Sequence, residues 1–85
     1  MPDLPALLAE REHLAMADRH IAEGECRVTV QALRVEQLGR DARDDANARK
    51  LLLALQQTLD TWNTHRNAIL REIARLEGAG PPSRT

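Results

Sequence analysis

Three histidines are the side chains of this sequence best suited to chemistry: His13, His20 and His65. Two imidazoles that meet could ligate a metal ion or act as a protonation switch at about pH 6. A zinc site needs three or four ligands, however, and His13 lies two helical turns, or ~10 Å, from His20. The favoured interpretation is that the histidines flank a packing seam. A metal- or pH-responsive module that uses His20 and His65 stays the alternative.

Cys26 and Trp62 are each the single residue of their kind. One cysteine allows no internal disulfide and no C-x-x-C motif, which fits a reducing compartment. The Cys26 thiol could sense redox state or form an intermolecular disulfide. We favour the interpretation that Cys26 is a small apolar residue on a second packing face. Trp62 could anchor a partner. Its helical spacing from other apolar residues favours a structural role in the seam.

The sequence contains none of the motifs that carry catalysis, such as a nucleophile elbow, a Gly-rich phosphate loop or an H-E-x-x-H pair. Its 12 basic and 13 acidic residues give a net charge of −1. Proteins that bind nucleic acid through phosphate contacts usually carry a clear excess of Lys and Arg. We therefore expect no enzyme activity, no cofactor, no bound metal and no nucleic-acid partner.

An apolar row in the first half of the chain recurs every seven residues, which keeps one face toward a partner and predicts a long, gently supercoiled helix. The row consists of Leu7, Leu14, Ile21, Val28 and Val35. We expect this helix over about residues 4–41, with Asp3 as its N-cap. Strong helix formers dominate the composition and clusters typical of strands are almost absent, so the fold class is all-α.

A second helix is predicted over about residues 45–77, after a turn at about 42–44. Asp44 is the expected N-cap, and Gly78 is the expected stop. Residues 79–85 are rich in Gly and Pro and are expected to form a disordered tail. The apolar row of the second helix consists of Ala48, Leu52, Leu55, Leu59, Trp62, Ile69, Ile73 and Leu76, with one interruption at Arg66.

So short a turn between two long helices predicts an antiparallel, coiled-coil-like hairpin spanning residues 1–78. Facing residues should then have numbers that add to roughly 86. This register places Trp62, the largest side chain, opposite Gly24, the smallest. It brings Arg66 near Asp18, and it sets His20 almost opposite His65.

The first helix carries a second set of apolar residues away from the seam, and a helix that is apolar on two faces has two neighbours. A single seam between two ~50 Å helices hardly offsets the entropy of ordering the chain. We therefore expect homodimerisation, most simply into a four-helix bundle, although a different protein could take the second copy's place. The predicted interaction face consists of Leu8, Ala15, Met16, Ala22, Cys26, Val30 and Leu33.

Residues 14–25 read LAMADRHIAEGE and resemble a group of short proteobacterial proteins that share an A-D-R-H-I-A-E-G-E signature. In that group a turn is followed by segments similar to residues 48–52 and 65–70. Residues 42–44 read Ala-Arg-Asp, where such sequences tend to have Gly-His-Asp. The resemblance implies a compact two-helix protein and brings no known activity, cofactor or partner.

The sequence shows neither a signal peptide nor a run of ~18 apolar residues that could span a membrane. We therefore expect a cytoplasmic protein with no membrane partner. The function that these features favour is that of a non-catalytic adaptor or regulator, which acts through self-association and contacts with other proteins.

Overall fold

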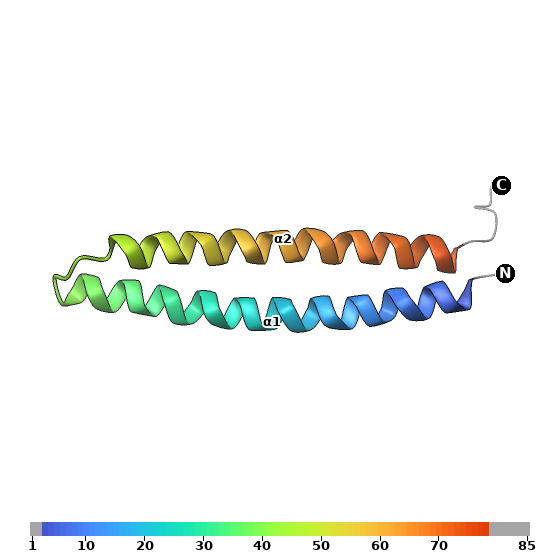
Figure 1. Cartoon of the computed structure of the whole chain (residues 1–85), viewed down its shortest axis with the longest axis horizontal. Helices are drawn as coiled ribbons and strands as arrows, with labels where there is room; N and C mark the ends of the chain where they lie inside the picture. Colours follow the sequence, from blue (N-terminus) through green and yellow to red (C-terminus); the bar gives the residue numbers. More distant parts are fainter. Residues whose placement is uncertain (1–2, 79–85) are drawn as a thin grey trace.

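The computed structural model describes residues 3–78 and consists of two long helices joined by one turn. Helix α1 spans Leu4–Arg40 and helix α2 spans Ala46–Glu77. Figure 1 shows the two helices lying side by side and running in opposite directions. Within residues 3–78 there is no strand. The predicted all-α helical hairpin is therefore confirmed, whereas the predicted tail at 79–85 lies outside the described residues.

The N-terminus of α1 is capped as predicted. The Asp3 carboxylate accepts a hydrogen bond from the backbone N–H of Ala6 at 3.1 Å, which satisfies one of the free donors of the first turn. At its other end α1 stops at Arg40, and the backbone N–H of Asp41 donates to the carbonyl of Gln37. Ala42 then takes a φ of 54°, a left-handed conformation that turns the chain out of the helix.

The start of α2 differs from the prediction by one residue. Asp44 was the expected N-cap, but the N-cap position belongs to Asp45, whose side chain makes no capping hydrogen bond. The Asp44 carboxylate instead accepts from the N–H of Ala46 at 3.0 Å, and Asp45 pairs with Arg49. The turn is thus longer than predicted and covers residues 41–45. It contains the left-handed residue Ala42, and three further residues follow before α2 begins.

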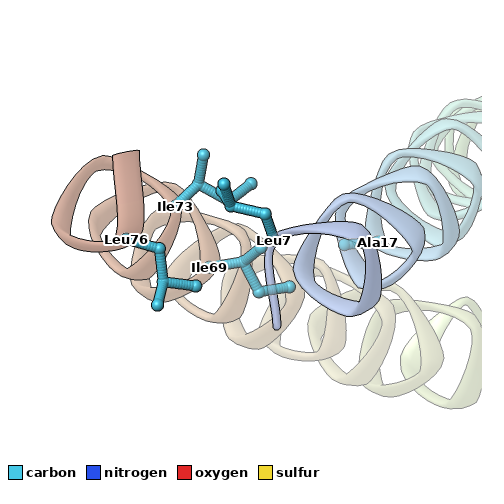
Figure 2. Packing of buried hydrophobic residues seen from close by; sticks show 5 residues of the cluster. All are labelled: Leu7, Ala17, Ile69, Ile73 and Leu76. Carbon is cyan, nitrogen blue, oxygen red and sulfur yellow. The ribbon is translucent and has the colours of Figure 1, made fainter. Parts of the chain in front are cut away.

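The predicted apolar rows of both helices face each other along the whole hairpin. In both rows the residues near the turn are half-buried, and the buried residues lie farther from the turn. Figure 2 shows the tightest part of this seam, where side chains from both helices meet. That cluster consists of Leu7, Ala17, Ile69, Ile73 and Leu76. The core is therefore densest at the end of the hairpin away from the turn.

The register near the middle of the seam is not the predicted one. A Cβ atom added to Gly24 would lie 3.2 Å from Cδ1 of Leu59, so Leu59 and not Trp62 fills the space beside this glycine. Trp62 lies half-buried against His20 at the edge of the seam. Nearer the open end the predicted pairing of Arg66 with Asp18 is confirmed at 2.5 Å.

The hairpin is a thin plate, 63 Å long, 24 Å wide and 14 Å thick. Its radius of gyration is 19.2 Å, compared with ~12 Å expected for a compact domain of this length. The thickness is close to the ~10–12 Å diameter of a single helix with its side chains. Both broad faces of the plate are therefore open, and each helix has a free side opposite its seam.

Candidate interaction surfaces

All seven residues of the predicted interaction face are exposed on α1. The two leucines of this set, Leu8 and Leu33, keep 64% and 59% of their surface accessible. Met16 and Val30 are exposed to a similar degree. These residues occupy helical positions between those of the seam, and two of them, Cys26 and Val30, also line a groove shared with α2. The structure shows that these residues are exposed, and the interaction face that they were expected to form stays a prediction.

A shallow groove of about 560 Å³ runs beside the seam in the half of the hairpin near the turn. Its walls are mainly apolar, with Cys26 and Val30 on α1 and Leu51 and Leu55 on α2. Glu23 stands at its rim. The sequence placed Leu51 outside the seam but gave no sign of the groove. The groove arises because small and short side chains on α1 meet leucines on α2 that only partly cover them.

Gln31 is the one buried polar residue within the described chain, with 8% of its surface exposed. Its Nε2 donates a hydrogen bond to the carbonyl oxygen of Ala48 at 3.0 Å, although that oxygen belongs to a helix backbone. A carbonyl has two lone pairs and can accept this second bond. Because a buried donor must find its acceptor, Gln31 fixes how far α1 slides along α2. Gln31 lies three residues after Val28 and four before Val35, and this spacing between two members of the apolar row was the signal that it faces α2.

Two of the three histidines converge on Trp62. The His20 ring stacks on the indole with the ring centroids 4.3 Å apart and the planes 15° apart. The His65 ring meets the indole edge-on at 5.6 Å. Trp62 is thus the neighbour that His20 and His65 share. His20 also has the Glu23 carboxylate at 3.9 Å, which would pair with the ring in its protonated form.

Metal coordination by these histidines gains no support from their surroundings. Within residues 3–78 no three His, Cys, Asp or Glu side chains come close enough together to hold a metal ion. His13 lies beside Glu10 at 3.4 Å, in the half of α1 that precedes His20. The cluster around Trp62 is therefore best described as an aromatic stack at the edge of the seam.

Cys26 is exposed, as its predicted place on the outer side of α1 requires. It lines the apolar groove next to Val30. At this position the thiol can act as a small apolar contact residue, and it is also accessible to oxidants in solution.

Surface ion pairs surround these apolar areas. Arg75 binds both carboxylate oxygens of Glu72, at 2.8 and 2.5 Å. These hydrogen bonds lower the pKa of Glu72 and raise the pKa of Arg75. Arg11 pairs with Glu77 across the two helices at the open end. Such exposed pairs orient side chains, but each contributes little to stability. The apolar surfaces are therefore the main candidates for an interaction site.

Comparisons with family models, curated proteins and solved structures give no match for the chain. The resemblance to the proteobacterial group therefore stays a prediction. Among the described residues no helix combines the length and apolar character needed to cross a membrane. The function has to be argued from the surfaces of the hairpin.

Proposed function

We propose that this chain is a non-catalytic helical hairpin that self-associates and acts through protein–protein contacts, as an adaptor or regulator in the cytoplasm. The observation that carries the proposal is the exposure of large apolar side chains along α1, outside the seam. Leu8, Met16, Val30 and Leu33 all belong to this surface. Exposed apolar residues that recur along one side of a helix are typical of an interface.

The energetics of the hairpin support the same conclusion. Among residues 3–78 six apolar residues are buried, and the plate is only 14 Å thick. Fully burying one Leu, Val or Met side chain contributes about 1.5–3 kcal/mol. Covering the four large side chains of the α1 surface would therefore add a stabilisation comparable to much of the total stability of a small domain. A second copy is the simplest partner, and it would give an assembly of four helices.

Light scattering and sedimentation at micromolar concentration test the proposal. The wild-type chain should have the mass of a dimer. Leu33→Glu should shift it toward the monomer while the helical circular dichroism spectrum is kept. Leu53→Glu is the matched control, since Leu53 has a similar exposed fraction of 55% but lies on α2. A monomeric wild-type chain would contradict the proposal, and so would equal effects of the two variants.

A metal- or pH-responsive module is the second candidate function. The observation behind it is that His20 and His65 both contact the indole ring of Trp62. Protonation of a ring stacked on Trp62 should change the emission of this tryptophan. Under this alternative, wild-type emission would change between about pH 5 and 8, the range in which histidine titrates. The change would be absent in His20→Ala. Zinc would also raise the melting temperature. Constant emission and no zinc effect would exclude the alternative.

A further inference from the structure

One line of exposed residues on α1 has a spacing that is symmetric about its own centre. We call this line the outer row. Its members alternate in steps of four and three residues, so they form a continuous strip along the helix. All of them are exposed. The outer row consists of Leu8, Glu12, Ala15, Arg19, Ala22, Cys26, Thr29 and Leu33.

A second copy of α1 laid antiparallel on the outer row would place each member of the row opposite another member of the row. With the centre between residues 20 and 21, Leu8 faces the partner's Leu33, and Ala15 faces the partner's Cys26. Ala15, Ala22 and Cys26 are small and allow the two helix backbones to approach each other, while the long Arg19 side chain has to extend toward the flank of the contact. The leucines close the contact at both ends. A two-fold axis at this centre repeats each of these contacts once.

The charges beside the outer row suit the same arrangement. Arg19 takes part in none of the ion pairs found within residues 3–78, and Glu23 has only the distant contact with His20. In the antiparallel pair Arg19 lies level with the partner's Glu23, which gives two equivalent ion pairs. On the other flank Asp18 approaches the partner's Glu25. That repulsion is reduced because Asp18 is already bound to Arg66 at 2.5 Å.

The area of such a contact is sufficient for a stable dimer. From Leu8 to Leu33 the row is ~37 Å long at 1.5 Å per residue, on a cylinder ~10–12 Å wide. Covering one side of it buries on the order of 600 Å² per partner from the helix cylinder alone, close to the ~800 Å² per partner of a standard interface. The projecting side chains of Met16 and Val30 flank the row and would add to this area.

We propose that two copies of the chain pair through the outer row, α1 against α1 and antiparallel, about a two-fold axis between His20 and Ile21. The inference depends on the proposed self-association and adds the geometry of its interface. The two α1 helices form the centre of the four-helix assembly, and the α2 helices lie outside them. The groove between Val30 and Leu51 lies beside this interface and is not its centre.

Cysteine cross-linking tests this register. Ala15→Cys, with the native Cys26 retained, places two thiols of different copies face to face, within the ~7 Å between Cα atoms that a disulfide requires. Copper phenanthroline, which takes up the two electrons, should convert this variant into a covalent dimer on a non-reducing gel. Peptide mapping should find the bond between the introduced thiol and Cys26. The wild-type chain should not cross-link, because the two Cys26 residues lie eleven positions apart along the helices, or ~16 Å.

Two matched variants serve as controls. Ala32→Cys changes another exposed alanine of α1, but one that lies off the outer row. It should therefore give no covalent dimer with Cys26. Ala15→Cys combined with Cys26→Ser keeps only one thiol per chain and should also stay uncross-linked. Light scattering under reducing conditions gives the oligomeric state independently of any disulfide.

The outcomes separate the interface from self-association itself. A reduced dimer with a cross-link only in Ala15→Cys supports the inference. A reduced dimer whose wild-type Cys26 residues cross-link to each other would indicate a different interface, such as a parallel pair or a pair joined through the groove. That result would overturn the inference and leave self-association standing, as would a dimer in which Ala15→Cys does not cross-link. A monomer under all conditions would overturn both.

Discussion

At Gly24 the backbone of α1 lies close to the Leu59 side chain of α2. A Cβ at this position would meet the terminal Cδ1 methyl of Leu59 at 3.2 Å, a short contact with the mobile end of a half-buried side chain. Glycine inside a helix is about 1 kcal/mol less favourable than alanine. Replacing Gly24 by alanine would therefore raise the helix propensity but would require a small displacement of the Leu59 methyl group.

We expect Gly24→Ala to stabilise the hairpin by about 0.5 kcal/mol, because the Leu59 methyl can move by a few tenths of an ångström at less cost than the propensity gain. Gly24→Leu should destabilise it by about 1–3 kcal/mol, since several atoms would overlap α2. Urea unfolding followed by circular dichroism measures both changes. Gly39→Ala is the control, because nothing lies within 4 Å of a Cβ there. A destabilising Gly24→Ala would mean that Leu59 cannot move.

The pKa of Glu72 is lowered from its ordinary value of 4.5, chiefly by its hydrogen bonds from Arg75; desolvation opposes this shift, and the charge of Arg75 makes the smallest contribution, which also lowers the pKa. A carboxyl whose folded pKa is lowered adds stability above its unfolded pKa. That contribution is lost as the pH falls through the lowered value. Because the pair is exposed, its share of the total stability is small.

Arg75→Ala should therefore return the titration midpoint of Glu72 to the ordinary range and weaken the dependence of stability on pH below about 4.5. Carbon-detected NMR of the Glu72 carboxyl measures the midpoint directly. Arg71→Ala removes a nearby arginine that makes no ion pair within the described residues, and it should leave the midpoint unchanged. An unaltered midpoint in Arg75→Ala would contradict the bidentate contact.

At the scale of the helices, the seam is not uniform. Ile69, Ile73 and Leu76 of α2 are buried against Leu7 and Ala17 of α1, whereas the rows near the turn are only half-buried apart from Gln31. The turn holds the two helices together at one end, so the dense cluster at the opposite end prevents the hairpin from opening. Gln31 adds a register-fixing hydrogen bond in the part where apolar contact is weaker.

Ile73→Ala should reduce the free energy of unfolding by about 2–4 kcal/mol, because it removes buried methyl groups from the cluster that closes the open end. Leu53→Ala removes a comparable amount of side chain at an exposed site of α2 and should change stability by less than about 0.5 kcal/mol. Chemical denaturation of both variants at equal concentration provides the comparison. Similar losses in the two would show that the seam does not carry the stability.

At the scale of the whole molecule, the plate-like shape exposes each helix on the side opposite its seam. A chain of this kind has a small core of its own and gains stability when a second copy covers its free surface. The free energy of unfolding should then depend on the protein concentration. A dependence of stability on concentration distinguishes a hairpin that is stable as a monomer from one that is stabilised by dimerisation.

The melting temperature should therefore rise with protein concentration, as expected when folding and dimerisation are coupled. Each tenfold increase in concentration is equivalent to about 1.4 kcal/mol of association free energy. Thermal unfolding from about 1 to 100 µM, followed by circular dichroism, measures the effect. Leu33→Glu should melt at a lower temperature and with little dependence on concentration. A wild-type melting temperature that stays constant would indicate a monomer that folds alone.

The sequence by itself determined the elements and the faces of the helices. Apolar spacing, the Asp3 cap and the breaking residues near Asp41 depend on contacts within a few positions along the chain, so they can be identified without knowing what lies across the seam. The exposed positions of Leu8 and Leu33 follow from the same helical period. These features agree with the structure to within one or two residues at the helix ends.

Only the tertiary structure decided how the two helices match. Leu59, and not Trp62, lies beside Gly24, and the buried amide of Gln31 finds its acceptor on α2. The stack of His20 on Trp62 and the groove beside Leu51 are consequences of that match. Spacing along one chain repeats every few residues and leaves several registers equally plausible. The sizes and hydrogen bonds of side chains that meet across the seam select one of them.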